Sequence, residues 1–207
     1  MTNREKAELV FEEELKDVHH VREFVLDCFE KLTPDYFWEV AASSSGKHHP
    51  KITNRKHGLI IHTKLCVWWG KKIAQSFYSY DLEVVIASLL LHDLQKFGTE
   101  MSVYDGKPTL ANYTSTHGMI LAVQMRQLLK DQNKTVSYGK FETITACVGL
   151  HMGKWTDELL GDKWIKEYRN NDNVKIVQLA DYCASRKVGA KMEELDKLTF
   201  GELNEQN

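Results

Sequence analysis

A strongly apolar run that ends in two ionisable side chains constrains this chain more than any other stretch. Residues 86–91 read Ile-Ala-Ser-Leu-Leu-Leu, as in a buried helix, and His92 and Asp93 follow at once. Lys96 and Gly98 then close the stretch. Because burying an imidazole and a carboxylate is costly without compensation, the pair must satisfy one another or meet a cation. A divalent metal suits both, since histidine nitrogen and aspartate oxygen are common ligands.

The composition indicates a globular protein built around one substantial core. The 207 residues suffice for one domain and are too few for two comfortable ones, so we expect a single domain over residues 1–207. The net charge of −2 gives no reason to expect long nucleic acid as a partner. The N-terminus lacks the apolar segment of a signal peptide, and no stretch is long enough to cross a membrane. We therefore expect a cytoplasmic protein without a membrane partner.

The four cysteines point to the same compartment. Cys28, Cys66, Cys147 and Cys183 are widely spaced and form no CxxC pair. Three of them lie in runs that look helical and buried. We interpret them as small hydrophobic residues in a reducing environment, in preference to disulfides or a thiolate metal site.

Helical periodicity is common and strand-like alternation is scarce, which predicts an all-α helical bundle. We expect helices over residues 2–31, 35–41, 58–77, 81–96, 113–131, 138–151 and 173–188. A loop with a short helix is expected over residues 155–168, and a tail that is helical at first over 192–207. Asp81 is a suitable N-cap for its helix. The apolar side of the first helix would consist of Leu9, Val10, Leu15, Val18, Val21, Val25 and Leu26.

Two connections attract attention as substrate-binding segments. Residues 42–50, Ala-Ser-Ser-Ser-Gly-Lys-His-His-Pro, form either a solvated loop or a loop whose hydroxyls, backbone N–H groups and Lys47 meet a phosphate, with His49 beside it. The glycine spacing excludes a Walker loop. Residues 98–112 contain Gly98, Gly106 and Pro108 without apolar periodicity, and they follow the His-Asp pair directly. A lid or substrate-selecting loop is expected there.

Four more ionisable residues fall on apolar helix faces: His62, His117, His151 and Asp181. Any one of them alone is more often a hydrogen-bonded core residue than a ligand. Together with the His92-Asp93 pair, they follow one another at intervals of roughly one helix and one loop. A bundle in which each helix contributes one inward ligand needs this spacing. The donors suit Mn, Fe, Zn, Co or Ni, and Mg remains possible although so many imidazoles disfavour it.

At these residues the sequence resembles the HD-domain metal-dependent phosphohydrolases. The order His, His-Asp, His, His, Asp carries the resemblance, which covers residues 58–187. Its local pieces are residues 58–63 (GLIIHT), 91–96 (LHDLQK) and 179–182 (LADY). One departure is visible, because many members have His-Asp-x-Gly-Lys and Gln95 stands here in place of the glycine. Lys96 keeps its register.

The resemblance implies a metal site between the helices of an HD-type bundle. It gives a first ion four ligands, namely His62, His92, Asp93 and Asp181. Asp93 would bridge to a second ion ligated by His117 and His151. In one-metal members the equivalent histidines can bind the substrate phosphate instead, so one ion and two ions both stay open. Lys96 would stabilise phosphate charge or orient the nucleophile.

The expected reaction is hydrolysis of a phosphomonoester or phosphodiester by a metal-activated water, with Asp93 and Lys96 as the catalytic residues. Lys47, His49 and Lys96 would bind the substrate. A nucleotide or a related small phosphoester is the expected substrate, and Tyr104, Trp155 or Tyr182 could stack on a base.

Two alternatives to hydrolysis stay open. Some HD-fold proteins with a di-iron centre are oxygenases, and the ligands for such a centre are present. A module that binds a nucleotide without turning it over is the other alternative, because the fold does not fix the function. A homo-oligomer is compatible with the sequence, since Trp68, Trp69 and the N-terminal helix could form a dimer face, although packing in the core explains them equally well.

Overall fold

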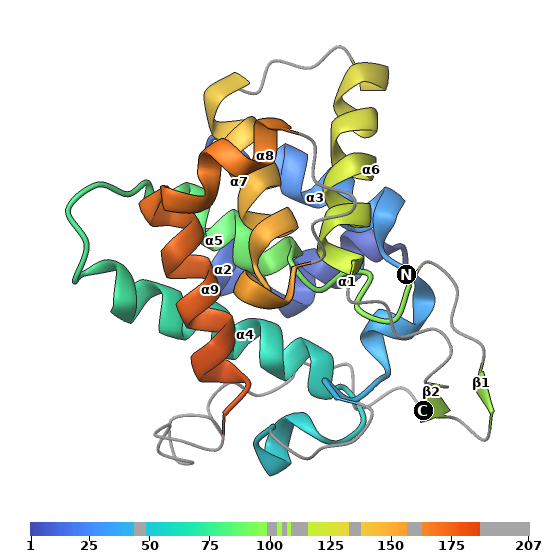
Figure 1. Ribbon diagram of the computed structural model, residues 1–207. Coiled ribbons are helices and arrows are strands. Elements are labelled where there is room, and N and C mark those ends of the chain that lie inside the picture. Colours follow the sequence, from blue (N-terminus) through green and yellow to red (C-terminus); the bar gives the residue numbers. More distant parts are fainter. Residues whose placement is uncertain are drawn as a thin grey trace.

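The structure is a computed structural model that describes residues 1–43, 49–98, 103–104, 107–108, 116–132, 138–156 and 163–186. Helix α5 (Leu82–Leu91) lies in the middle of the bundle (Figure 1). Every residue from Val84 to Leu91 is at most 2% exposed. A helix that is apolar all round can be stable only where other helices cover each of its faces.

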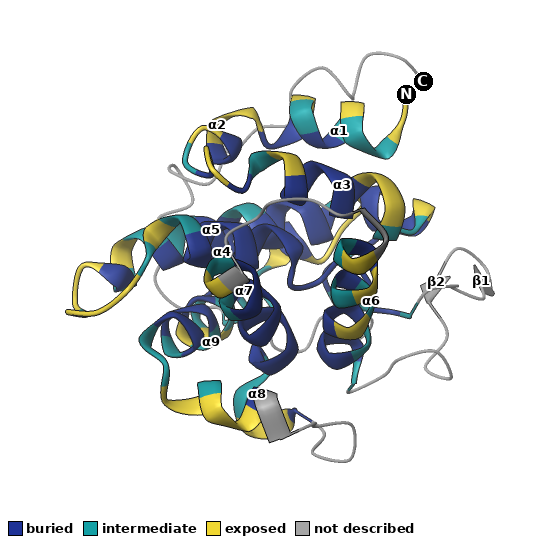
Figure 2. Cartoon of the chain, turned by 90° about the horizontal axis from the view of Figure 1, so that it is seen from above, coloured by how far each residue is buried: buried dark blue, intermediate teal, exposed yellow. Residues whose placement is uncertain are grey.

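Those helices lie in layers on the two sides of α5 (Figure 2). On one side α3 (Arg22–Leu32) contacts α5, and α1 (Asn3–Val10) covers α3 together with α2 (Glu12–Leu15). On the other side lie α4 (Gly58–Ala74), α7 (Tyr138–Leu150) and α9 (Asp172–Ala184), with α8 (Lys163–Glu167) beyond α7. Helix α6 (His117–Gln132) runs beside α7 and also contacts α3. The prediction of an all-α bundle is confirmed.

Short elements complete the description. The 3-10 helices are η1 (Asp35–Trp38), η2 (Lys51–Thr53), η4 (Gly153–Trp155) and η6 (Tyr168–Asn170). Two-residue strands β1 (Val103–Tyr104) and β2 (Lys107–Pro108) pair antiparallel inside the stretch expected to be an irregular loop. Residues 99–102, 105–106 and 109–115 of that stretch, and the tail 187–207, lie outside the described residues. No helix in the described ranges combines the length and apolarity needed to cross a membrane.

The expectation of one long N-terminal helix is wrong, because the chain leaves the helical path between α2 and α3. Turns with i→i−3 hydrogen bonds replace it, from the N–H of Asp17 to the carbonyl of Glu14 and from the N–H of Val21 to that of Val18. Glu83, on α5, accepts the N–H groups of His20 and Val21 at the start of α3. Glu83 therefore satisfies two of the backbone N–H donors that the start of α3 leaves without a partner inside the helix.

One residue of the expected apolar side of that helix also differs. Leu9 is 40% exposed, whereas the other six residues named for that side are buried. Because α1 ends at Val10, its short apolar face is filled by Ala7 and Val10, and Leu9 points away from it.

Helix α5 ends at Leu91, five residues before the predicted end at Lys96. Residues 92–97 continue in turns, with i→i−3 bonds from the N–H of Leu94 to Leu91 and from the N–H of Lys96 to Asp93. Gly98 then adopts φ 91°, in the left-handed region that favours glycine. The Gln95 side chain donates to the Leu32 carbonyl (3.0 Å) and to Gln124 Oε1 (2.5 Å), so it fixes this turn between α3 and α6.

Candidate metal centre

The structure brings together all six side chains predicted as metal ligands. His62 comes from α4 and Asp181 from α9, while His92 and Asp93 lie in the turn after α5. His117 is the first residue of α6, and His151 follows the last residue of α7. The four histidines and Asp93 are at most 3% exposed, and the Asp181 side chain is 18% exposed. The approach of five helices to one point thus produces a buried polar cluster.

One group of donor atoms surrounds His62 and His92. The Nε2 atom of His62 is 3.1 Å from Asp181 Oδ1, and the Nε2 atom of His92 is 3.9 Å from the same oxygen. Asp93 Oδ2 is 3.4 Å from each of these two nitrogens. These separations of 3.1–3.9 Å bracket those of ligand atoms that share one ion, since zinc bonds of about 2.0–2.2 Å to nitrogen and oxygen in a tetrahedron place ligand atoms about 3.3–3.6 Å apart.

A second group lies on the other side of the same carboxylate. Asp93 Oδ1 is 3.0 Å from His117 Nε2 and 3.6 Å from His151 Nε2, and these two nitrogens are 3.0 Å apart. The two oxygens of Asp93 therefore face different pairs of histidines, which is the arrangement of a carboxylate that bridges two ions.

Backbone carbonyls orient two of the rings. His92 Nδ1 donates to the Leu89 carbonyl and His151 Nδ1 donates to the Val148 carbonyl, each at 2.7 Å. With the proton on Nδ1, the lone pair of Nε2 is directed into the cluster. Metal-binding histidines are commonly held in this way by an outer hydrogen bond.

Gly118 allows the second group to form. A Cβ atom at this position would lie 2.6 Å from the Val148 carbonyl oxygen and 2.8 Å from His151 Nδ1. The start of α6 can therefore approach the end of α7 only without a side chain there, and this approach brings His117 to His151.

Lys96 keeps the position that the resemblance implies. Its Nζ is 2.5 Å from Asp93 Oδ2, and its side chain is 12% exposed. Burial opposes the charge on Lys96, yet Asp93 and Asp181 outweigh it and raise the pKa of the ammonium. Replacement of the expected glycine by Gln95 thus leaves a cation at the edge of the cluster.

The cluster shifts the pKa values of its members in opposite directions. Burial favours neutral His92, but the adjacent Asp93 carboxylate outweighs it and raises the pKa of His92 to about 10. Burial together with His117 and His92 lowers the pKa of His151 to about 3. Burial also opposes ionisation of Asp93, yet Lys96 and His92 hold the pKa of its carboxyl well below the usual value. Without a metal ion, protons thus compensate for the charges of the two carboxylates.

Of the two residues predicted to bind substrate from the loop, His49 lies beside the cluster. Its ring centroid is 5.5 Å from that of His62. Burial, His62 and Lys96 lower the pKa of His49 to about 3, and its buried Nε2 atom has no hydrogen-bond partner within the described part of the chain. Lys47 lies outside the described residues, as does the side chain of Tyr104.

The sequence analysis missed Cys66 as a member of the cluster. All four cysteines are free thiols, and Cys28, Cys66 and Cys147 are buried, as expected. Cys66, however, lies one turn after His62 on α4 and forms a compact group of donors with His62, His92 and Asp181. The signal was present in the sequence, because residues four apart share one face of a helix.

The donor set fits a transition-metal ion. In each of the two groups the donor atoms lie within 4.8 Å of one another, and together they supply imidazole nitrogen, carboxylate oxygen and one thiol. Imidazole and thiolate suit zinc, iron, cobalt and nickel, whereas magnesium prefers oxygen ligands.

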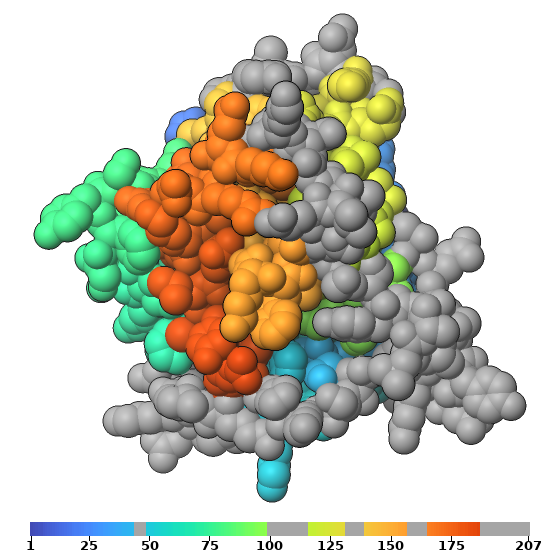
Figure 3. All heavy atoms as spheres, viewed as in Figure 1, coloured from blue at the N-terminus to red at the C-terminus, as the bar shows by residue number. Residues whose placement is uncertain are grey.

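Two exposed aromatic side chains lie close in sequence to the cluster. Trp155 in η4 is 67% exposed and Tyr182, next to Asp181, is 57% exposed. Each carries a cation, with Lys154 Nζ 4.8 Å from the Trp155 ring and Arg186 4.5 Å from the Tyr182 ring. Figure 3 shows η4 and α9 as neighbouring orange and orange-red surfaces on one face of the molecule, and Gly153 approaches Gln178 of α9.

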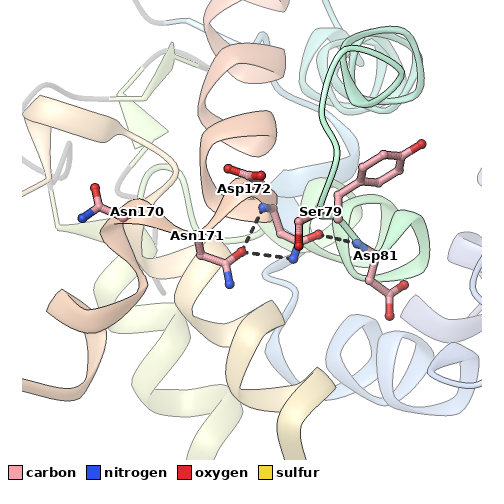
Figure 4. Close-up of a pocket in the computed structure, with 7 residues that line it drawn as sticks. Ser79, Asp81, Asn170, Asn171 and Asp172 are labelled. Atoms are coloured by element: carbon pink, nitrogen blue, oxygen red, sulfur yellow. Dashed lines mark hydrogen bonds between the residues drawn. The ribbon is translucent and has the colours of Figure 1, made fainter.

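A polar pocket lies at a different place in the fold (Figure 4). It is lined by residues 79–81 and 170–173, none of which was predicted as a site residue. Asn171 Oδ1 accepts from the backbone N–H of Asn173, and Asn173 Oδ1 accepts from the N–H of Asp81 at 2.8 Å. These bonds join the N-terminal ends of α5 and α9, which gives the pocket residues a structural role.

The family model of the HD domain matches residues 59–186. The chain belongs to the HD-domain family. Separate searches among curated proteins and among solved structures gave no match. The resemblance seen in the sequence is therefore confirmed, and this HD domain carries its candidate metal ligands between the helices of the bundle. Members of this family are generally metal-dependent hydrolases, which is the coarse class that the match supports.

Proposed function

We propose that this HD domain hydrolyses a small phosphoester, a nucleotide in the first instance, in a reaction that depends on one or two divalent transition-metal ions. The first ion would be held by His62, His92, Asp93 and Asp181. Asp93, His117 and His151 would hold the second. When bound, such ions supply a hydroxide nucleophile near neutral pH and neutralise charge on the phosphoryl group.

The observation that carries the proposal is the position of Asp93. Its two carboxylate oxygens face different pairs of histidine nitrogens, with separations of 3.4 Å on one side and of 3.0 and 3.6 Å on the other. A carboxylate in this position can fix two cations close together. That geometry suits in-line displacement at phosphorus, in which the attacking and leaving oxygens both need stabilisation.

Lys96 supplies the chain's own positive charge at the reacting group. Its ammonium lies 2.5 Å from Asp93 Oδ2 and its side chain is 12% exposed, so it can contact both the cluster and an entering phosphate. There it would neutralise charge that grows on the phosphoryl oxygens in the transition state. His49, whose Nε2 has no partner in the ranges that the structure describes, is a second group that can bind the substrate.

Trp155 and Tyr182 support a nucleotide as the substrate. Both rings are more than half exposed, although large aromatic side chains in a globular domain are mostly buried. They follow His151 and Asp181 closely in the chain, and each is paired with a cation. An exposed ring beside a cation offers a stacking surface for a base and a charge for a phosphate.

A substrate panel tests the proposal. Mono-, di-, tri- and cyclic nucleotides would be incubated with the protein and, in parallel, Mn²⁺, Co²⁺ or Zn²⁺, and release of phosphate or nucleoside would be measured with and without EDTA. We expect release that EDTA abolishes and that Asp93→Ala abolishes. A nucleotide that binds without product would favour the binding module, and oxygen uptake by the iron-loaded protein would favour the oxygenase; either result would overturn the proposal.

Two lysine variants make the test sharper. Lys96→Met should reduce kcat by about 10²-fold or more, the usual effect of losing one group that stabilises transition-state charge. Lys140→Met is the matched control, since Lys140 also pairs with carboxylates, Asp81 and Glu83, but at the other end of α5. Equal losses in the two variants would remove Lys96 from the mechanism.

A further inference from the structure

Cys66 lies where a ligand of the first ion would lie. It follows His62 by one helical turn on α4 and is fully buried. Its Sγ atom is 3.4 Å from His62 Nε2 and 3.9 Å from His92 Nε2. This sulfur therefore faces the two nitrogens that the metal site requires.

The separations around this sulfur fit a four-coordinate centre. The two histidine nitrogens lie 3.1 and 3.9 Å from Asp181 Oδ1, and 3.4 and 3.9 Å from the sulfur. A tetrahedral ion with zinc–sulfur and zinc–nitrogen bonds of about 2.3 and 2.0 Å requires about 3.3–3.6 Å along such edges. Side-chain movements of a few tenths of an ångström would close the sphere.

A second observation on the same side of the cluster points to a ligand. Among the described residues, the buried Nε2 atom of His49 has no hydrogen-bond partner, and the His49 ring lies 5.5 Å from that of His62. Buried nitrogen atoms nearly always have a partner. The region around His62 therefore has bonding capacity that the described residues leave unused.

We propose that Cys66 binds, as a thiolate, the ion held by His62, His92 and Asp181, and that this sulfur makes the first site select zinc, cobalt or iron over manganese and magnesium. The thiol proton is released to solvent when the ion binds. The selection follows because soft thiolate ligands favour the former metals and hard oxygen ligands the latter. The inference rests on the metal dependence of the proposed function.

A thiolate ligand would also give the two metal sites different numbers of protein ligands. With Cys66, the first ion has four protein ligands before Asp93 is counted. Among the described residues the second ion would have Asp93, His117 and His151 as ligands, so more of its positions would be open to water and substrate. Closed coordination is typical of structural sites and open coordination of catalytic ones. The attacking water would therefore bind chiefly at the second ion.

Absorption of the cobalt-loaded protein tests the thiolate directly. Co²⁺ bound to a cysteine thiolate gives an intense charge-transfer band in the near ultraviolet, which nitrogen and oxygen ligands do not give. We expect the band in the wild-type protein, and its loss in Cys66→Ala and Cys66→Ser. Cys28→Ala is the matched control, since Cys28 is equally buried but lies on α3, which supplies no donor to either group. It should keep the band.

Metal competition tests the selectivity. Cys66→Ala should weaken zinc binding by at least about tenfold and leave manganese binding nearly unchanged, since loss of even an outer partner of a metal site costs about 10- to 100-fold. If the variants fail to fold, X-ray absorption of the wild-type zinc protein decides instead. One sulfur neighbour at about 2.3 Å is expected.

The outcomes separate this inference from the proposed function. Bound metal without a charge-transfer band or a sulfur neighbour would overturn the role of Cys66 and leave hydrolysis intact. A band that Cys66→Ala removes, in a protein that releases no phosphate from any nucleotide, would support the ligand and overturn the proposed function.

Discussion

The two ends of α5 show how differently one helix can handle buried charge. At its N-terminal end, Asp81 caps the helix by accepting from the N–H groups of Glu83 and Val84. Lys140 lies 2.8 Å from Asp81 and 2.5 Å from Glu83, and the N–H of His20 occupies another oxygen of Glu83. Carboxylates, ammonium and backbone donors thus satisfy one another at the edge of solvent.

At the C-terminal end the charges lie deeper, and protons on the imidazoles balance the carboxylates when no metal ion is bound. Asp93 is 1% exposed and faces four imidazoles and one ammonium, with Asp181 beside it. His117 Nε2 and His151 Nε2 approach to 3.0 Å, a separation that requires either a proton or a shared cation between them. The comparison teaches that the first end is complete without a ligand, whereas the second is built for one.

The largest difference between the two ends of α5 should appear in bound metal and kcat/KM when one carboxylate at each end is replaced. Asp93→Asn removes the charge that both donor groups share, so we expect loss of bound metal and a fall in kcat/KM of about 10³-fold or more, because metal ions supply several kcal/mol of transition-state stabilisation. Asp81→Asn keeps a capping oxygen and should leave both unchanged. Metal analysis and steady-state kinetics check this pair. Equal metal content in the two variants would contradict the proposed role of Asp93.

Metal removal should destabilise the C-terminal end of α5 and leave the stability of its N-terminal end unchanged. An ion at about 100 times its dissociation constant stabilises a fold by about 2.7 kcal/mol. For a chain of this size that corresponds to roughly 5–10 °C in Tm. Hydrogen exchange locates the effect: the N–H groups of Leu94 and Lys96 should lose protection with EDTA, while that of Val85, bonded to Asp81, should keep it. Uniform loss along α5 would break the comparison.

The sequence predicts the C-terminal end of α5, with its candidate ligands, better than the N-terminal end. The six candidate ligands could be identified because each is an ionisable residue on an otherwise apolar helix face, and because their order resembles that of a known family. Cys66 lies on the same face as His62 but was interpreted as a core residue, since a cysteine on an apolar face has the same periodicity whether or not it binds a metal. A core cysteine and a candidate ligand can be told apart only in the folded structure, where α4 approaches the turn after α5.

The breaks in the helices were harder to predict. The turn between α2 and α3 depends on Glu83, which lies more than sixty residues away and accepts the N–H groups that the break exposes. The early end of α5 at Leu91 depends on Gln95, whose side chain is held by α3 and α6. Both features arise from contacts between distant segments, and local periodicity carries no information about them.

Removal of the Asp81 N-cap should lower the stability of the fold moderately and leave metal binding and activity unchanged. Asp81→Ala leaves the N–H groups of Glu83 and Val84 without a partner, which should cost about 1 kcal/mol, the usual price of a lost N-cap. We expect Tm to fall by about 2–4 °C. Metal content and kcat should stay at the wild-type values, because the cap and the metal cluster lie at opposite ends of the helix. Thermal unfolding and metal analysis of the same samples check both parts; a loss of metal would show that the ends are coupled.

The smallest effect concerns the charge of Glu83. Burial opposes its ionisation, but Lys140 and the N–H of His20 outweigh this and lower the pKa of Glu83 below 4.5. A carboxyl with a lowered pKa in the folded state stabilises the fold above its unfolded pKa, and this contribution is lost as the pH falls through the folded value. Glu83→Gln should therefore be less stable than wild type near pH 7 by about 0.5–1 kcal/mol, the size expected for a partly exposed ion pair.

The difference in stability between wild type and Glu83→Gln should shrink as the pH falls below about 4.5, because protonated Glu83 then resembles glutamine. Urea unfolding of both proteins in EDTA measures it, since EDTA removes any contribution from metal release at acid pH. Lys140→Met should reproduce the same profile. A difference that stays constant or grows towards acid pH would show that Glu83 acts through hydrogen bonding alone. In that case the N-terminal end of α5 would owe its stability to backbone donors, and the charges of Lys140 and Glu83 would contribute little.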